Sequence, residues 1–326
     1  MNSFSTHKYL FKIVKVYNSI EDFSPKFKVI LTLGTFDGVH IGHQSIISQL
    51  NEVSKSIGGE SVLLTFYPHP RHVLFPEDNN LFLITSIEER KDLLKQHGLD
   101  HLIIHPFSLE FSRMNSVHFV RDILVQKLNI NTLVIGYDHH FGRNRKGNFD
   151  ELISLSKIYD FNLMKIKPKT LDKVKVSSSK IRKLILSGNI KNANNYLGSR
   201  FTLKGLVVLG NQLGSDIGYP TANIQLDSDF KIIPPFGVYV VTVMYEDINY
   251  VGILNIGNNP TISHLNDPTI EVHILDFSKN LYDEKIRIFF VEKIRNLEKF
   301  DSINLLAKAI NEDEKLVRDQ YSYLFN

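Results

Sequence analysis

Two histidines, His40 and His43, stand where a predicted strand gives way to a predicted helix. The apolar run before them ends at Gly34, and apolar residues then recur at helical spacing through residues 46–53. A helix N-terminus attracts anions through its unpaired N–H groups and its dipole. Two imidazole donors, with Gly42 between them to let the backbone come close, add hydrogen bonds to such a site. The pattern therefore indicates a phosphate site of the kind that nucleotidyl transfer needs.

A second helix N-terminus carries a similar signal. Three serines at residues 177–179 precede a predicted helix, and Lys180 and Arg182 follow in its first turn. Serines before helices are usually N-caps, which bind the helix's own N–H groups. Cations are disfavoured at a helix N-terminus, however, so these two indicate a bound anion that offsets them. Two such termini in one half of the chain strengthen the interpretation as a phosphate-handling domain.

The composition is that of a globular protein without a strong charge bias. At 326 residues the chain is long enough for two domains, and 43% of the residues are hydrophobic. The 38 basic and 35 acidic residues leave a net charge of +3, too small to argue for a nucleic-acid or membrane surface. The absence of cysteine excludes disulfides and thiolate nucleophiles. Residues 1–20 have no signal-peptide core, and no apolar run has the length of a membrane span, so we expect a cytoplasmic protein.

Apolar strands alternate with amphipathic helices through the first half of the chain. The predicted strands are 29–33, 61–66, 101–105, 132–136 and 161–166. The predicted helices are 44–56, 87–97, 117–128, 149–159 and 179–186. This alternation implies an α/β Rossmann-like domain with a parallel sheet covered on both faces. Ligands bind at the carboxyl ends of strands in such sheets, where Gly34 and Gly136 lie.

The second half has a different pattern of predicted secondary structure. Its predicted strands are 203–209, 238–245, 250–254, 269–275 and 286–291, and turn clusters rather than helices separate them. Short strands in this arrangement indicate a compact antiparallel β-barrel, closed by one C-terminal helix at 302–317. The segment between the two patterns, 189–195, is polar and rich in asparagine. We therefore predict two domains, 1–187 and 188–326.

Four motifs make the first half recognisable. The sequence Gly-Thr-Phe-Asp-Gly-Val-His-Ile-Gly-His at 34–43, together with Ser-Ser-Ser-Lys-Ile-Arg at 177–182, resembles the HxGH nucleotidyltransferases. The motifs at 65–70 and 136–142 narrow the resemblance to the FMN adenylyltransferase half of the bacterial bifunctional FAD synthetases. That family transfers AMP from ATP to FMN with Mg²⁺ and releases pyrophosphate. The chemistry needs positioning and charge neutralisation rather than a covalent nucleophile.

The resemblance also implies roles for individual residues. His40 and His43 contact the phosphates and the charge that develops at the α-phosphorus, and Arg182 with Ser178 holds the β- and γ-phosphates. The remaining expected nucleotide-binding residues are Gly34, Thr35, Phe36, Asp37, Gly42, Ser177 and Ser179. The expected flavin-binding residues of this half are Pro68, His69, Asp138 and Phe141. His139 and His140 replace a Phe-Arg pair that the family often has, which leaves the contribution of that loop open.

A glycine-rich stretch at 205–223 resembles the signature of riboflavin kinases and ends in their Pro-Thr-Ala-Asn. By that resemblance, Thr221 and Asn223 bind the phosphates of Mg²⁺–ATP. Gly210, Gly214 and Gly218 let the nucleotide come close to the backbone. The stretch is not a P-loop, because it lacks the Gly-Lys-Ser/Thr ending.

Glu271 is the expected general base of this second half. Residues 269–276 alternate, so Glu271 lies opposite an apolar face, and the segment matches the Glu-Val-His of the kinase family. A base there would take the proton of the riboflavin 5′-hydroxyl as it attacks the γ-phosphate. Arg295 falls in the family's flavin-end region. Ser215 and Asn259 stand where the family often has arginines, which puts the rate of the kinase in question more than its identity.

The leading interpretation is a two-step enzyme that converts riboflavin to FMN and FMN to FAD. Its expected partners are ATP, riboflavin and FMN, with no nucleic acid and no membrane; the oligomeric state stays open. One alternative is a nucleotidyltransferase for another phosphate substrate, against which the Pro-Thr-Ala-Asn domain argues. A second is a non-catalytic flavin-binding regulator or assembly module, which the two missing arginines favour and the retained histidines and glutamate oppose. A third is a transition-metal site among the histidines of these loops, at 40, 43, 69, 72, 139 and 140.

Overall fold

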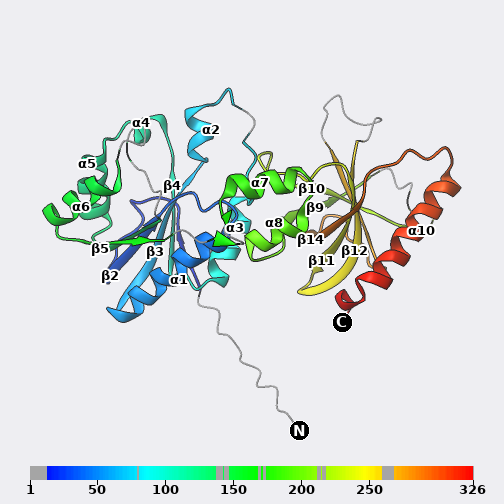
Figure 1. Ribbon diagram of the computed structural model, residues 1–326, viewed down its shortest axis with the longest axis horizontal. Helices are drawn as coiled ribbons and strands as arrows, with labels where there is room; N and C mark the ends of the chain where they lie inside the picture. The colour runs from blue at the N-terminus through cyan, green and yellow to red at the C-terminus, as the bar shows by residue number, and fades with distance from the viewer. Residues whose placement is uncertain are drawn as a thin grey trace, which may run out of the picture. The chain divides into compact units, whose positions relative to one another are not determined.

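The chain forms two compact units, coloured in chain order in Figure 1. The computed structural model describes residues 13–78, 81–136, 142, 147–167, 170–171, 174–210, 214, 218–258 and 268–325. The first unit holds residues 1–81 and 87–176, and the second holds 82–86 and 177–326. This grouping is by contacts within the structure, and the division into domains 1–187 and 188–326 remains a prediction.

The first unit is built on a parallel sheet of six strands in the order β1-β4-β3-β2-β5-β6. The strands are β1 (Lys15–Tyr17), β2 (Lys28–Leu33), β3 (Gly59–Tyr67), β4 (His101–Pro106), β5 (Ile130–Gly136) and β6 (Asn162–Ile166). The predicted parallel sheet is confirmed. Strand β1 was not predicted: it has only three residues and pairs at the edge of the sheet with β4.

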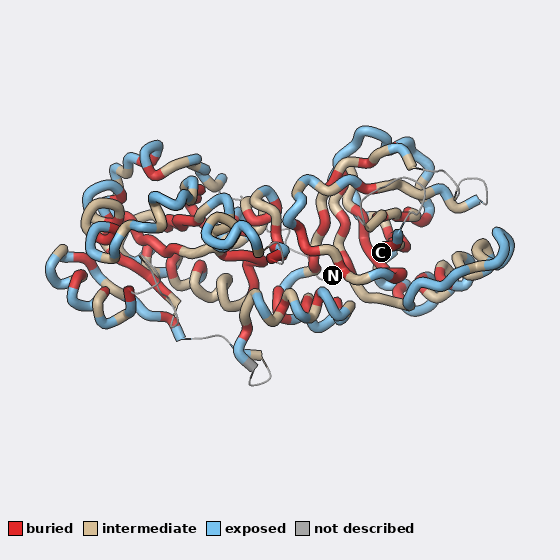
Figure 2. Tube along the Cα trace, turned by 90° about the horizontal axis from the view of Figure 1, so that it is seen from above, coloured by how far each residue is buried: buried red, intermediate tan, exposed pale blue. Residues whose placement is uncertain are grey.

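Helices pack on both faces of this sheet because neighbouring strand residues point to opposite sides. Ile30 packs with residues of α1 (Ile41–Ser56) and α3 (Ile87–Gln96), and Leu31 packs with residues of η1 (Phe119–Lys127) and α6 (Phe149–Ile158). The buried stretches follow the strands, as Figure 2 shows. The smaller elements of the unit are α2 (Pro70–Leu74), α4 (Leu109–Ser112), α5 (Ser116–His118), β7 (Thr170–Leu171) and β8 (Val174–Lys175).

One predicted helix differs in type from the expectation. Residues 117–128 were expected to form a single α-helix, but η1 is π-helical, and the Leu128 N–H donates to the Ile123 carbonyl five residues back at 2.9 Å. The amphipathic pattern that predicted a helix does not distinguish these two spacings over nine residues.

The strand order determines where a ligand can meet this sheet. From β2 the chain crosses to β3 on one side, while β5 pairs with β2 on the other side. The direction of winding therefore reverses between β2 and β5, which is where open α/β sheets bind ligands. The turn after β2 carries His40, and the loop after β3 carries His69. Both histidines thus follow the carboxyl ends of neighbouring strands.

The second unit contains a closed antiparallel barrel in the strand order β10-β13-β12-β11-β14-β9. Its strands are β9 (Thr202–Val208), β10 (Ala222–Leu226), β11 (Gly237–Tyr245), β12 (Ile248–Gly257), β13 (Thr269–Ile274) and β14 (Lys285–Arg295). Its helices are α7 (Ser178–Leu186), α8 (Ile190–Leu197), α10 (Ile303–Gln320) and the short η3 (Ser322–Leu324). The barrel and its C-terminal helix confirm the prediction. Strand β10 and helix α8 were not predicted.

A short segment from the first half of the sequence completes the second unit. The Leu83 N–H donates to the Phe230 carbonyl at 2.6 Å, and the Ile232 N–H donates to the Leu83 carbonyl at 2.9 Å. Lys231 is only 4% exposed, and its ammonium donates to the Ile84 carbonyl at 2.5 Å. The second unit therefore includes residues that precede α3 in the chain.

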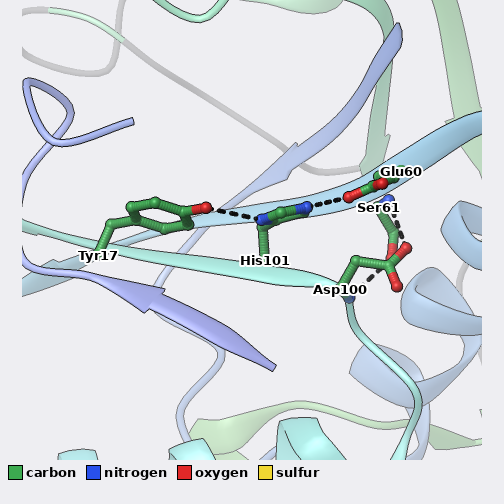
Figure 3. Close-up of polar contacts among 5 residues, drawn as sticks. All are labelled: Tyr17, Glu60, Ser61, Asp100 and His101. Atoms are coloured by element: carbon green, nitrogen blue, oxygen red, sulfur yellow. Dashed lines mark hydrogen bonds and ion pairs between the residues drawn. The ribbon is translucent and has the colours of Figure 1, made fainter. Parts of the chain in front are cut away.

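A polar network joins Tyr17 of β1 to the amino ends of β3 and β4 in the first unit (Figure 3). One carboxylate oxygen of Asp100 accepts hydrogen bonds from the N–H and the hydroxyl of Ser61, both at 2.9 Å. Beside it, His101 bonds to the Tyr17 hydroxyl at 3.1 Å and to the Glu60 carboxylate. The network lies at the sheet edge opposite the two histidine loops, so its role is to hold β1, β3 and β4 together.

Replacement of Asp100 by alanine should destabilise the first unit by about 1–3 kcal/mol, because a buried Ser61 N–H would lose its acceptor. Urea unfolding of the Asp100→Ala protein would measure the loss. The matched control is Glu110→Ala, an exposed acid of the same unit, which should stay within about 0.5 kcal/mol of the parent. Equal stability of the two variants would contradict the role given to this network.

Candidate active sites

The turn after β2 has an uncommon backbone. Phe36, Gly38 and Val39 all have positive φ, at 48°, 84° and 39°. A left-handed conformation is costly for a β-branched residue such as Val39, and it persists only where the surroundings hold it. Two backbone bonds do so: the Val39 N–H donates to the Phe36 carbonyl at 3.1 Å, and the Gly34 N–H donates to the Leu64 carbonyl of β3 at 3.1 Å.

His40 caps helix α1. Its Nδ1 accepts the backbone N–H of His43 at 3.3 Å, so the helix begins at Ile41 rather than at the predicted residue 44. A neutral His40 then carries its proton on Nε2, because Nδ1 is used as an acceptor. The Gln44 amide donates to the Val39 carbonyl at 2.9 Å and joins the first turn of the helix to the loop. The cap therefore fixes both the orientation and the tautomer of this imidazole.

Three rings stack in front of this helix. The centroids of His40 and His43 are 3.7 Å apart with an angle of 13° between their planes, and Phe36 stacks on the other side of His43 at 4.5 Å. Burial, and then the charges of His40 and Arg90, hold the pKa of His43 well below its usual 6.5. Its Nδ1 is buried and has no hydrogen-bond partner among the described residues. The structure thus brings the two predicted histidines together, and the lowered pKa keeps the His43 ring neutral at physiological pH.

The other predicted residues of this loop are close to the stack. A Cβ built on Gly42 would lie 3.1 Å from Nδ1 and Cε1 of His40, so the glycine leaves room for the imidazole. The Thr35 carbonyl accepts the Thr65 hydroxyl at 3.4 Å. Asp37 is fully buried, and its carboxylate lies 3.8 Å from the guanidinium of Arg90 on α3. The nucleotide-binding roles of Gly34, Thr35, Phe36, Asp37 and Gly42 stay predictions.

The loop after β3 carries the first predicted flavin-binding residues. Pro68 is exposed, and His69 caps α2 through its Nδ1, which accepts the Arg71 N–H at 3.2 Å. Asp138 and Phe141, like His139 and His140, lie outside the described residues. Within the described part of the chain, no three His, Asp or Glu side chains are grouped as a metal site would require.

Helix α7 begins with the predicted serines. Ser177 is its N-cap and accepts the Lys180 N–H at 3.4 Å, while Ser178 and Ser179 form the first turn. The Lys180 ammonium lies 5.0 Å from the centroid of the Tyr196 ring, so a protein partner stabilises this cation at the helix terminus. That contact weakens the argument that Lys180 indicates a bound anion. The phosphate-binding roles of the serines and of Arg182 stay predictions.

The barrel brings together a second set of predicted residues. Strand β13 pairs with β10 and β12, so that Glu271 stands directly opposite both Asn223 and Asn255. Directly opposite residues share one face of a sheet. Their neighbours Ile270 and Val272 are buried in the barrel, so the row of one carboxyl and two amides lies on the other, half-buried face.

The glycine-rich stretch approaches this row closely. A Cβ at Gly210 would overlap the Asn223 side chain, which explains why a glycine is required there. Gly214 accepts the Tyr219 N–H at 2.8 Å, and Gly218 has a φ of 85°. The segments 211–213 and 215–217 lie outside the described residues, and Ser215 with them; so does Asn259.

His273 holds the chain just before the predicted phosphate-binding residues, a role that the sequence analysis missed. Its Nδ1 donates to the Pro220 carbonyl at 2.8 Å, and its ring meets the Tyr219 ring edge-on at 5.5 Å. Because His273 and Glu271 share a face of β13, one strand carries the expected base and holds the residue that precedes Thr221. The alternation of residues 271 and 273 was the available signal.

Burial also changes the acidity of Glu271 in the second site. Desolvation raises the pKa of Glu271 above its usual 4.5, because a half-buried carboxylate has less water to solvate its charge. A base of raised pKa is a better proton acceptor at neutral pH than an exposed carboxylate.

Arg295 is engaged by the protein. Its guanidinium forms a bidentate pair with Asp313 of α10, at 2.9 Å and 2.7 Å, and its Nη1 donates to the Asn296 carbonyl at 3.3 Å. The hydrogen bonds to Asp313 raise the pKa of Arg295. This pair fastens the C-terminal helix to the barrel, and the predicted flavin contact stays a prediction.

Comparison with known proteins agrees with two sites in one chain. A family model described as FAD synthetase matches residues 24–180, and one described as riboflavin kinase matches residues 197–321. The bifunctional riboflavin kinase/FMN adenylyltransferase of Buchnera aphidicola subsp. Schizaphis graminum is 35% identical over 90% of this chain and 94% of its own. Its namesakes in Listeria monocytogenes and Escherichia coli K12 are 33% and 32% identical, over 90% and 94% of this chain and 93% and 97% of theirs.

A solved structure resembles the chain over nearly its whole length. This crystal structure from Streptococcus pneumoniae, described as a macrolide-efflux protein, superposes with a TM-score of 0.85 at 31% identity. It covers 94% of this chain and 99% of its own. Among the residues that our structure describes, no helix is long and apolar enough to cross a bilayer.

Replacement of Gly42 by alanine should slow nucleotidyl transfer about tenfold without loss of stability. The added Cβ displaces the His40 ring by a few tenths of an ångström, and misplacements near 1 Å cost about a hundredfold. Alanine in place of glycine favours the helix by about 0.5–1 kcal/mol, so the melting temperature should hold or rise. Steady-state kinetics and thermal denaturation of the same sample, with Ser48→Ala on the exposed side of α1 as control, check this. An unchanged rate would show that the ring position does not matter.

Phosphotransfer in the second unit should fall as the pH drops through the raised pKa of Glu271, since only the ionised carboxylate accepts a proton. The acid limb of kcat/KM should therefore lie above pH 4.5. A pH–rate profile measured with riboflavin tests this, and the limb should disappear in Glu271→Gln together with most of the rate. A limb at or below 4.5 would contradict the assignment.

Proposed function

The chain belongs to the bifunctional riboflavin kinase/FMN adenylyltransferase family and makes FMN from riboflavin and FAD from FMN with ATP; from that premise we propose how its residues divide the two reactions. The paired imidazoles of the first unit serve adenylyl transfer. The row around Glu271 on the barrel serves phosphorylation. The observation that supports this division is that the first unit holds the stacked imidazoles at the start of α1, whereas the barrel holds the row of Glu271, Asn223 and Asn255.

In adenylyl transfer a phosphate oxygen of FMN attacks the α-phosphorus of ATP, and the bond to the β-phosphate breaks to release pyrophosphate. His40 and His43 stabilise the charge that develops on the α-phosphate. Because Nδ1 of His40 is occupied by the helix cap, its Nε2–H is the donor. The low pKa of His43 keeps its ring neutral before the nucleotide arrives, so it acts as a hydrogen-bond donor rather than as a fixed cation.

In phosphorylation Glu271 takes the proton of the riboflavin 5′-hydroxyl as that oxygen attacks the γ-phosphate. The ADP oxygen leaves when its bond to the γ-phosphorus breaks. Asn223 stands opposite Glu271 in the sheet, so the base and a phosphate-side ligand are fixed by the same register. His273 keeps Thr221 in place through the Pro220 carbonyl.

Mg²⁺ fits the donor set of the barrel. The hydroxyl of Thr221 and the amide oxygen of Asn223 are the hard oxygen ligands that this ion prefers, and a glycine at 210 gives the Asn223 amide the space it occupies. The ion would neutralise phosphate charge during transfer. Two neutral protein ligands leave its other positions to phosphates and water, which is usual for Mg²⁺ with a nucleotide.

The remaining assignments follow the family resemblance. The roles of Ser177, Ser178, Ser179 and Arg182 at the β- and γ-phosphates of adenylyl transfer rest on the resemblance alone, because α7 is grouped with the barrel. Gly214 and Gly218 shape the kinase loop. Pro68, His69, Asp138, Phe141 and Arg295 contact flavin. ATP, riboflavin and FMN are the small-molecule partners. Neither nucleic acid nor a membrane has a role in this chemistry, and a cytoplasmic location is part of the proposal.

The two activities should separate by mutation. His43→Ala should lower FAD formation about 10²–10³-fold and leave FMN formation within twofold, because it removes a donor only from the first unit. Glu271→Ala should lower FMN formation and leave the conversion of added FMN to FAD within twofold. Chromatography of the flavin products, starting from riboflavin and separately from FMN, measures both steps.

His118→Ala and Glu284→Ala are the matched controls, as exposed residues of the same types in the same units. Both should retain both activities. If His43→Ala and Glu271→Ala each abolished both steps while melting like the parent, the assignment of one reaction to each unit would be overturned.

A further inference from the structure

Helix α3 carries a charged pair of neighbouring residues inside the protein. Glu89 is 4% exposed and Arg90 is 3% exposed. A guanidinium keeps its charge at all physiological pH values, so a buried arginine must be compensated by a partner. One such partner is Asp37, whose carboxylate oxygen lies 3.8 Å from Nη2 of Arg90.

The partner lies within the turn that carries the catalytic histidines. Asp37 stands between Phe36 and Gly38, which both have positive φ, and it is fully buried. Backbone conformations of this kind hold only where surrounding contacts determine them. The ion pair joins the middle of the turn to a helix that starts some fifty residues later.

Arg90 also acts on the ring stack at a distance. Burial lowers the pKa of His43 most, and the charges of His40 and then Arg90 lower it further. The cation therefore opposes a positive charge on His43, while Asp37 compensates the cation itself. Arg90 of α3 thus contacts the turn through Asp37 and also lowers the pKa of His43.

We propose that Arg90 is a positioning residue for adenylyl transfer: from helix α3 it holds Asp37, and through Asp37 the turn that presents His40 and His43. The inference rests on the proposed role of the two histidines. It gives Asp37 a place in the site that needs no contact with the nucleotide. It also explains why an arginine occupies the buried face of α3, between Ile87 and Leu94, where an apolar residue would otherwise pack.

The test compares Arg90→Gln, Arg90→Lys and the exposed control Lys95→Gln on the same helix. Arg90→Gln should lower kcat for FAD formation about a hundredfold, as expected for a misplacement near 1 Å, with riboflavin phosphorylation within twofold of the parent. Arg90→Lys keeps the charge without the planar fork and should recover part of the rate. Lys95→Gln should match the parent.

A pH profile distinguishes positioning of this site from a purely structural role. Loss of the cation should let His43 protonate at a higher pH, so the acid limb of FAD formation should move upward in Arg90→Gln and stay near the parent position in Arg90→Lys. If Arg90 had only a structural role, its replacement would lower the melting temperature and change neither the acid limb nor kcat. That result would overturn the inference.

The double variant Asp37→Asn/Arg90→Gln covers the case in which Arg90→Gln does not fold, because it removes both buried charges together. With Asp37→Asn measured as well, the rate of the double variant should fall no further than that of the worse folded single variant, since the two side chains act as one unit. Independent, multiplying losses would contradict the pairing. If His43→Ala retained FAD formation, the proposed function would fail first; if it lost FAD formation and Arg90→Gln did not, only the present inference would fail.

Discussion

Removal of water from an ionisable side chain is the interaction on which both halves of the molecule depend. Burial favours the uncharged form of a group whatever its sign. It lowers the pKa of His43 in the first unit and raises that of Glu271 in the second. In the proposed mechanism the first group is then a neutral donor to phosphate, and the second is a stronger proton acceptor. The same physical cause would serve a different reaction in each fold.

The supports for these two groups differ in kind. His43 is held by a helix cap and by stacking on Phe36 and His40, that is, by side chains packed around a strained turn. Glu271 is held by strand register, because its neighbours across the sheet are set by backbone hydrogen bonds. A turn of this kind depends on a few contacts, and small changes in it displace the rings. A register depends on many bonds, so the barrel fixes its row with little help from any single side chain.

The sequence predicted those parts of the fold in which hydrophobic periodicity is strong. It predicted the parallel sheet and the barrel, because each strand is long enough to show its pattern. It did not predict β1 (Lys15–Tyr17), which owes its strand pairing to a neighbour far away in the chain. Helix α8 (Ile190–Leu197) was not predicted because its segment is polar and rich in asparagine, although its buried residues 190, 193 and 197 lie three and four apart. The start of α1 was placed too late because histidine is not among the usual N-caps.

Motifs predicted the residues that contact substrates, whereas the residues that hold them in place left weaker signals. Arg90 interrupts the apolar face of a predicted helix, and His273 follows Glu271 at strand spacing. Neither position has meaning until the fold brings Asp37 to the first and Pro220 to the second. A charged or aromatic side chain on a face predicted to be buried therefore indicates a partner elsewhere in the chain. When that partner lies in a turn that a motif predicts to bind substrate, as Asp37 does, the pair is a candidate part of the site beside the motif itself.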